Sequence, residues 1–138
     1  MKKVWIIIII VLSSLISIGG YCIFDSIFPI AEPINYPSED TIISILLTPN
    51  NDNSITIEAS SFEDISRNIC NAKATRKMSV NDYPTVEVYY TIKVNTSTRE
   101  YRYYIYTENS QVYIEIPYQG IYTSNQQLLV TVMEYFDA

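Results

Sequence analysis

Alternation of apolar and polar residues dominates the second half of the chain. In residues 86–94, valine, tyrosine and isoleucine occupy every second position, which is typical of a strand buried on one face. The alternation returns in residues 99–107 and in residues 112–116, where Pro117 ends it because proline cannot donate to a ladder. Turn-forming residues at 95–98 and 108–110 separate the three segments. Short turns join antiparallel neighbours, so the pattern predicts a three-stranded meander.

Tyrosine falls on both faces of this expected meander. Tyr101 and Tyr103 share the core face with the valines and isoleucines. On the other face, four tyrosines would form a half-exposed aromatic surface: Tyr89, Tyr104, Tyr106 and Tyr113. Such a surface is a candidate binding face, because amphipathic aromatics are favoured at interfaces. It is also typical of an ordinary sheet, because tyrosine has good strand propensity and pairs well across strands.

Two further strands and two helices are expected outside the meander. Residues 41–47 and 54–58 flank a loop rich in asparagine and predict a hairpin; the loop lacks the ligand spacing of an EF-hand. Residues 60–72 have apolar positions at helical spacing behind a capping box of Ser60 and Glu63. Residues 124–136 repeat that pattern behind Ser124 and Gln127. The order β-β-α-β-β-β-α predicts an α+β fold, with an antiparallel sheet of about five strands and two helices packed on one face.

The N-terminus carries an apolar run without charge. Val4–Phe24 contains 21 uncharged residues and would span about 31 Å as a helix, which matches the hydrocarbon core of a membrane. We therefore expect a signal anchor or transmembrane helix over residues 1–24, an extended proline-containing linker over residues 25–37, and a domain over residues 38–138. Lys2 and Lys3 precede the run, so the domain is expected outside the cell membrane in a single-pass topology. The alternatives are secretion after cleavage near residues 17–19 and lipid attachment at Cys22.

Charge and composition exclude several classes of function. The chain has net charge −6, and because Lys2 and Lys3 precede the apolar run, the part after it carries −8. This balance argues against nucleic acid and against an anionic membrane surface. The sequence has no histidine, which removes the usual general base and the commonest transition-metal ligand. No cofactor, metal or enzymatic activity is expected.

The cysteines and one basic cluster leave alternatives open. Cys22 and Cys70 could pair in a disulfide, or Cys70 could be a small buried apolar residue of the expected helix. A cluster of three basic residues, Lys73, Arg76 and Lys77, follows the same helix. Cations there suit the helix dipole, and they could also form a patch for an acidic partner.

Two stretches of the sequence resemble a known family. They are Ala74–Thr85 (ATRKMSVNDYPT) and Tyr113–Tyr122 (YIEIPYQGIY). Both are similar to segments of an uncharacterised domain family of Firmicutes cell-envelope proteins, whose members tend to follow a signal or membrane segment. The resemblance covers residues 38–138. It implies a Gram-positive surface location and supplies no catalytic residues.

The same stretches supply the candidate site residues. Asn81, Asp82, Glu115, Tyr118 and Tyr122 lie in or beside loops at strand ends. If the two loops meet, these residues form one polar site edged by aromatic rings. The alternative is structural, with the prolines and glycine setting turn geometry and the polar side chains satisfying backbone donors.

We expect a membrane-anchored extracytoplasmic binding module, held by its N-terminal helix, for a protein, peptide or cell-wall ligand. A sensor, an inhibitor or an immunity protein would all fit this description. The alternative is a small carboxylate-dependent cell-wall or glycoside hydrolase. That chemistry needs two acids on either side of one cleft, and Asp82, Glu87 and Glu115 are its candidates.

Overall fold

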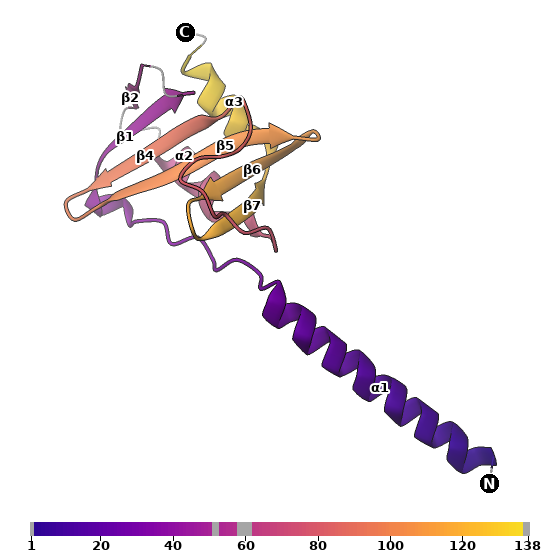
Figure 1. Cartoon of the computed structure of the whole chain (residues 1–138). Helices are drawn as coiled ribbons and strands as arrows, with labels where there is room; N and C mark the ends of the chain where they lie inside the picture. Colours follow the sequence, from indigo (N-terminus) through magenta and orange to yellow (C-terminus); the bar gives the residue numbers. More distant parts are fainter. Residues whose placement is uncertain (1, 51–52, 58–61, 137–138) are drawn as a thin grey trace. The chain divides into compact units, whose positions relative to one another are not determined.

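The computed structural model describes residues 2–50, 53–57 and 62–136 of the chain, which fall into two compact units, Met1–Ile30 and Ala31–Ala138 (Figure 1). The elements in chain order are α1 (Lys2–Ile27), the 3-10 helix η1 (Glu39–Thr41), β1 (Ile42–Pro49), β2 (Ile55–Ile57), α2 (Phe62–Cys70), β3 (Lys73–Ala74), β4 (Tyr90–Thr96), β5 (Glu100–Glu108), β6 (Gln111–Ile116), β7 (Gly120–Ser124) and α3 (Gln126–Glu134).

The first unit is built around the single helix α1. The most apolar 18-residue stretch within its residues 3–27 has a mean hydropathy of 2.5, and the helix is long and apolar enough to cross a membrane. Its apolar side chains are exposed along its length, which suits a lipid environment. A signal sequence near the N-terminus has the same properties, so both an anchor and a cleaved signal fit this helix.

The second unit is an α+β domain around one antiparallel sheet. Within the described residues the sheet has seven strands in the order β2-β1-β4-β5-β6-β7-β3, and every neighbouring pair is antiparallel. The hairpin β1–β2 forms one edge, and the chain then crosses through α2 to β3 at the opposite edge. Residues 75–89 return to the middle of the sheet, where the meander from β4 to β7 begins (Figure 1).

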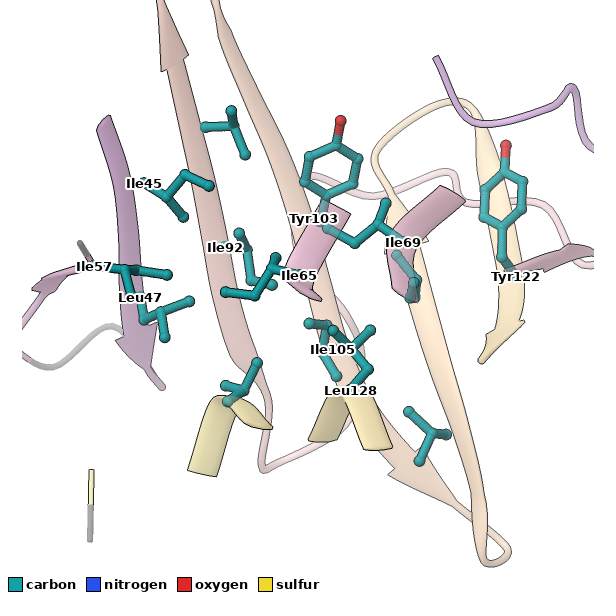
Figure 2. Packing of buried hydrophobic residues seen from close by; sticks show 14 of the residues in the cluster. Ile45, Leu47, Ile57, Ile65, Ile69, Ile92, Tyr103, Ile105, Tyr122 and Leu128 are labelled. Carbon is teal, nitrogen blue, oxygen red and sulfur yellow. The ribbon is translucent and has the colours of Figure 1, made fainter. Parts of the chain in front are cut away.

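One face of the sheet carries the hydrophobic core. Ile65 and Ile69 of α2 and Leu128 and Val132 of α3 are fully buried, each pair four residues apart on one helical face. They pack with the alternating apolar residues of the central strands, including Ile92, Tyr103, Ile105, Ile114 and Tyr122 (Figure 2). Every member of this core lies at or after Ala31, so the second unit has a hydrophobic core of its own.

The opposite face of the sheet is covered, which corrects one expectation. Tyr104 and Tyr106 are 1% and 6% exposed, although the alternation predicted a half-exposed surface. The long segment 75–89 lies across them, on the face away from α2 and α3 (Figure 1). The alternation correctly separated the two faces, but it carries no information about what covers each face.

The sheet also has more strands than expected. No strand is expected between Pro117 and the last helix, whereas the turn after β6 occupies only Pro117–Gln119 and Gly120 of β7 already pairs with Ile116. The two-residue strand β3 extends the sheet by pairing with β7. β4 begins at Tyr90, four residues after the expected start at Val86, and Val88 is exposed.

Several element boundaries differ from the sequence prediction. α2 ends at Cys70, so Lys73 lies in β3 and not at the helix end. The N-cap of α3 is Asn125, whose side chain accepts a hydrogen bond from Leu128 N, and not Ser124. Ser60 of the expected capping box and residues 51 and 52 of the expected turn loop lie outside the described residues.

Residues that were expected to form a free linker pack on the domain. Ala31 is buried, and its N–H donates to Thr75 O at 2.9 Å. Tyr36 stacks on Tyr103 with 5.7 Å between ring centroids, and Pro37 is buried. The packed part of the chain therefore starts at Ala31, seven residues before the expected domain boundary at residue 38.

The cysteines do not form the expected arrangements. Cys22 and Cys70 are both free, so they are not joined by a disulfide. Cys70 is exposed at the end of α2 and is not the buried apolar residue that the helical pattern predicted.

Candidate functional site

The two stretches that carry the family resemblance meet in the fold. Tyr118 lies in the turn between β6 and β7, with a φ of 60°, and its hydroxyl donates a hydrogen bond to Asp82 Oδ1 at 2.8 Å. Nearby, Ile121 N–H donates to Lys77 O at 3.0 Å. The Asp82 carboxylate raises the pKa of the Tyr118 hydroxyl, because this hydrogen bond requires the proton. Asp82 and Tyr118 therefore lie together at one end of the sheet.

A buried polar cluster of Ser79, Tyr106 and Glu115 also joins segment 75–89 to the sheet. Glu115 is 6% exposed, and its Oε1 accepts a hydrogen bond from Ser79 Oγ at 2.7 Å. Burial raises the pKa of the Tyr106 hydroxyl, and the neighbouring Glu115 carboxylate, to which that hydroxyl donates, raises it further. Glu115 is thus partnered within the protein, as a buried carboxylate must be.

Aromatic contacts complete the covered face. Tyr83 and Tyr89 both pack on Tyr104, with ring centroids 5.9 Å and 5.5 Å away, the second edge-on. Tyr106 packs on Tyr113 at 5.7 Å, and Lys77 Nζ lies 4.6 Å from the Tyr113 ring centroid. Such pairs contribute about 0.5–1.5 kcal/mol each beyond their area burial. These rings act mainly to hold segment 75–89 against the sheet.

A pocket of about 400 Å³ opens beside the meeting point of the two loops. We call it the β5 pocket, because the start of β5 forms its floor. Its lining comes from segments that are far apart in sequence: Asn35, Asp82, Tyr83, Arg99, Glu100, Tyr101, Arg102, Tyr103, Ile116, Pro117 and Gln119. Its volume lies within the range of roughly 300–1,000 Å³ that is usual for small-ligand sites.

The charged groups of the β5 pocket differ in how they are paired. Arg102 Nη2 contacts Glu100 Oε1 at 2.6 Å, and this pairing raises the pKa of the guanidinium. Asp82 accepts the Tyr118 hydroxyl. The Arg99 guanidinium lies over the Tyr101 ring at 4.0 Å, and among the described residues it forms no ion pair. Arg99 is therefore a cation available to a ligand.

A second hollow of about 350 Å³ lies near β3 and the start of α3, and its lining is dominated by amide side chains. Asn125 Nδ2 donates to Asn68 Oδ1 there at 3.0 Å. It has neither aromatic residues nor acids in its lining. Among the described residues, no group of three or more histidine, cysteine or acidic side chains is placed to hold a metal ion.

Comparison with known families identifies the domain. Residues 30–123 match the model of the family DUF5301, which is described as a domain of unknown function (DUF5300). The chain belongs to this family. The DUF5301 match includes both stretches that carry the resemblance and begins within one residue of the point where the folded domain starts.

A solved structure shows the same domain in another protein. The NMR structure of a protein from Ruminococcus gnavus is 32% identical, with a TM-score of 0.57, and the match covers 65% of this chain and 89% of that chain. The match therefore spans nearly the whole of that chain, and a source among the Firmicutes agrees with the expected family origin. No curated protein matches the chain.

The sequence-predicted site residues occupy three different places in the DUF5301 domain. Asp82 lines the β5 pocket, with Asn81 and Tyr118 exposed beside it. A second group lies under or along segment 75–89: Tyr89, Tyr104, Tyr106, Tyr113 and Glu115. Tyr122 points into the opposite face, where its hydroxyl donates to the carbonyl of Glu32.

Most of the pocket lining was missed by reasoning from the sequence. Asn35 lies in the expected linker, and residues 99–103 form the start of a strand that was assigned only structural roles. One signal was available: Arg99, Glu100 and Arg102 place three charges at the start of one strand, next to a turn. Gln119 lies within the second family stretch but was not among the candidate site residues, although it lines the pocket.

Proposed function

We propose that this protein is a membrane-anchored, extracytoplasmic binding module that holds its ligand in the β5 pocket. The observation that carries the proposal is the convergence of both family stretches on this pocket, where Asp82 and Tyr83 face Ile116, Pro117 and Gln119. Aromatic rings and charges of both signs give such a pocket the means to orient a polar ligand.

The anchoring half of the proposal rests on α1 and its flanking charges. Lys2 and Lys3 lie at the N-terminal end of the helix, and Asp25 lies near its other end. The excess of basic residues on cytoplasmic flanks would keep the N-terminus inside and place the domain outside. Asp25 contributes little to this bias, because the rule concerns basic residues.

Catalysis by a carboxylate pair has less support in the geometry. Of the three candidate acids, only Asp82 lines the β5 pocket. Glu115 is enclosed beneath segment 75–89 and is held by Ser79, and Glu87 is exposed elsewhere on that segment. Ligand binding therefore explains more of the arrangement of these acids than hydrolysis does.

The binding proposal is tested by capture from envelope extracts of the source cells. Residues 31–138 would be immobilised beside the variant Arg99→Ala, which alters the pocket, and the variant Arg67→Ala, which alters an exposed arginine on α2. We expect one or more components to be retained by the native domain and by Arg67→Ala, and lost with Arg99→Ala. Equal retention by all three, or retention of nothing, would contradict the proposal.

A further inference from the structure

The floor of the β5 pocket is a strand edge that no neighbouring strand covers in the part of the chain that the structure describes. β5 pairs with β4 from Glu100 onward, but it pairs with β6 only from Tyr104 to Glu108. Among the described residues, no strand therefore pairs with the first four residues of β5, Glu100–Tyr103, on the β6 side. Residues of an antiparallel strand direct their N–H and C=O groups to alternate sides, so two of these four offer both groups to the open side.

The open edge exists because β6 stops early. β6 ends at Ile116, and Pro117 then turns the chain towards β7, so the strand that would cover Glu100–Tyr103 is missing. Ile116, Pro117 and Gln119 instead form the far wall of the pocket. At about 3.4 Å per residue, four residues offer an edge of about 14 Å, enough for a short extended segment. Among the described residues, no hydrogen bond from outside the sheet reaches the backbone of these four.

Natural sheets usually protect such edges, because an unpaired edge is a template for another strand. Here the edge lies within a pocket that also holds Tyr101 and Tyr103, and Tyr103 is 2% exposed with a hydroxyl that has no partner among the described residues. Figure 2 shows the Tyr103 and Tyr122 hydroxyls pointing the same way, away from the aliphatic side chains of the core. The pocket thus combines unused backbone groups with aromatic walls.

The charged side chains of the β5 pocket indicate which chemical group of a ligand would bind there. The other charges have internal partners: Arg102 is paired with Glu100, and Asp82 is bonded to Tyr118. Arg99 has its guanidinium stacked on Tyr101 and lies one residue before the open edge. A planar guanidinium held on a ring is suited to a carboxylate, which it can bind through two parallel hydrogen bonds.

We propose that the β5 pocket binds an extended peptide segment, which adds a short strand to the open edge at Glu100–Tyr103 and places a carboxylate against Arg99. This rests on the proposed function and specifies the ligand class. Main-chain pairing supplies affinity in strand addition, and side-chain pockets supply specificity. The carboxylate comes either from an acidic side chain or from the C-terminus of the peptide.

The test uses random heptapeptides displayed in two formats, one with free C-termini and one with the random stretch inside a longer chain. Both would be selected on residues 31–138, which contain the whole hydrophobic core. We expect peptides with a free C-terminus or a fixed acidic position to be enriched, and the two formats distinguish these sources. The leading peptide should shift the backbone amide NMR signals of residues 99–103 and 116–119.

Two changes then separate strand addition from other binding. Arg99→Ala should weaken the leading peptide at least about tenfold, whereas Arg67→Ala should change its affinity less than about twofold. Methylating alternate peptide amides should weaken binding at least about tenfold in one of the two registers, because only one set of N–H groups faces β5.

The outcomes also distinguish this inference from the proposed function. The peptide proposal would be overturned if no peptide were enriched. It would also be overturned if the affinity of the enriched peptides changed neither with Arg99→Ala nor with amide methylation. Capture of an envelope component that depends on Arg99 would leave the binding function standing in that case. Peptide binding at the open edge without any envelope ligand would instead support the peptide chemistry and count against the proposed function.

Discussion

Two buried tyrosines on the core face of the sheet differ in what their hydroxyls contact. The Tyr122 hydroxyl donates to Glu32 O and accepts from Gln119 Nε2 at 2.8 Å, whereas the Tyr103 hydroxyl has no partner among the described residues. Both side chains are almost fully buried, at 0% and 2% exposure. An enclosed polar group costs free energy unless it is hydrogen-bonded, so one substitution should have opposite effects at the two positions.

We predict that Tyr103→Phe raises the free energy of unfolding by about 1 kcal/mol and that Tyr122→Phe lowers it by about 1–2 kcal/mol. The second change removes two hydrogen bonds and leaves the Glu32 carbonyl unpaired. Urea denaturation of residues 31–138 measures both effects, and each variant serves as the control for the other. Loss of stability in Tyr103→Phe would show that its hydroxyl is satisfied in solution.

Ser79 provides a second prediction at the same scale, because it connects segment 75–89 to the buried carboxylate of Glu115. Hydrogen bonds to charged groups contribute about 1.5–3 kcal/mol. Ser79→Ala should therefore lower the free energy of unfolding by about that amount, measured by urea denaturation. Ser97→Ala is the matched control, since Ser97 is exposed in the turn between β4 and β5 and should change stability little. Similar values for the two variants would argue against the buried cluster.

The residue pattern predicted side-chain direction better than exposure. Alternation placed Tyr103 and Ile105 on one face and Tyr104 and Tyr106 on the other, as the structure has them. It could not show that segment 75–89 covers the second face, because residues 75–85 have no periodic pattern and the alternation at residues 86–89 predicted a strand instead. Its contacts rest on single residues such as Ser79 and Tyr83, which sequence reasoning assigns to loops.

At the scale of elements, the first residue of β7 packs closely on the N-terminal segment of the domain. A Cβ atom on Gly120 would lie 2.5 Å from the Cβ of Ala31, and its next neighbours would be 3.7 Å away. Gly120→Ala should lower the free energy of unfolding by about 1–3 kcal/mol, the usual cost of overpacking. Urea denaturation of residues 31–138 measures the loss.

The partner variant makes this prediction specific. Ala31→Gly removes the clashing Cβ, so the double variant Ala31→Gly/Gly120→Ala should recover the part of the lost stability that comes from this contact, relative to Ala31→Gly alone, while the backbone strain of a side chain at the positive φ of residue 120 remains. If the stability losses of the two single variants simply add in the double variant, the close contact between residue 31 and β7 does not persist in solution.

Element prediction succeeded where a pattern was long and failed where it was short. The meander and the helices have several turns or alternations each, but β3 has only two residues, and β7 follows directly on a turn. The β5 pocket was harder still to predict. Its walls come from Asn35, residues 99–103 and Gln119, and only the sheet topology brings them together. Asp82 was found because its loop carries a recognisable stretch of sequence.

At the scale of the whole molecule, the charges around α1 predict its direction in a membrane. With Lys2 and Lys3 at its N-terminal end, the domain should lie outside the cell. Alkaline phosphatase fused after Ala138 should therefore be active in cells, and the variant Lys2→Glu/Lys3→Glu should lower that activity. Mass spectrometry of the product distinguishes the two forms with the domain outside, since an anchored protein retains the residues before position 17 and a protein cleaved near residues 17–19 has lost them. An inactive fusion would contradict both.

Alkaline pH should unfold the domain, because five enclosed tyrosines resist ionisation. Burial is the first cause that raises the pKa of each: Tyr36, Tyr103, Tyr104, Tyr106 and Tyr122. Below pH about 10 these groups are protonated in both states, so their contribution to stability is fully present. Above pH about 10 they lose protons in the unfolded chain only, so the free energy of unfolding falls as pH rises towards their folded pKa values.

The size of this effect sets the pH of unfolding. Each such tyrosine removes up to about 1.4 kcal/mol per pH unit, so five remove several kcal/mol per unit from a domain whose total stability is about 5–15 kcal/mol. We expect residues 31–138 to unfold one to two pH units above about pH 10, with tyrosinate absorbance and near-ultraviolet circular dichroism changing in one cooperative step. Gradual ionisation of all tyrosines near pH 10, with the near-ultraviolet signal retained, would show that these rings are open to water. The covered sheet face and the packing of Tyr36 on Tyr103 would then both be wrong.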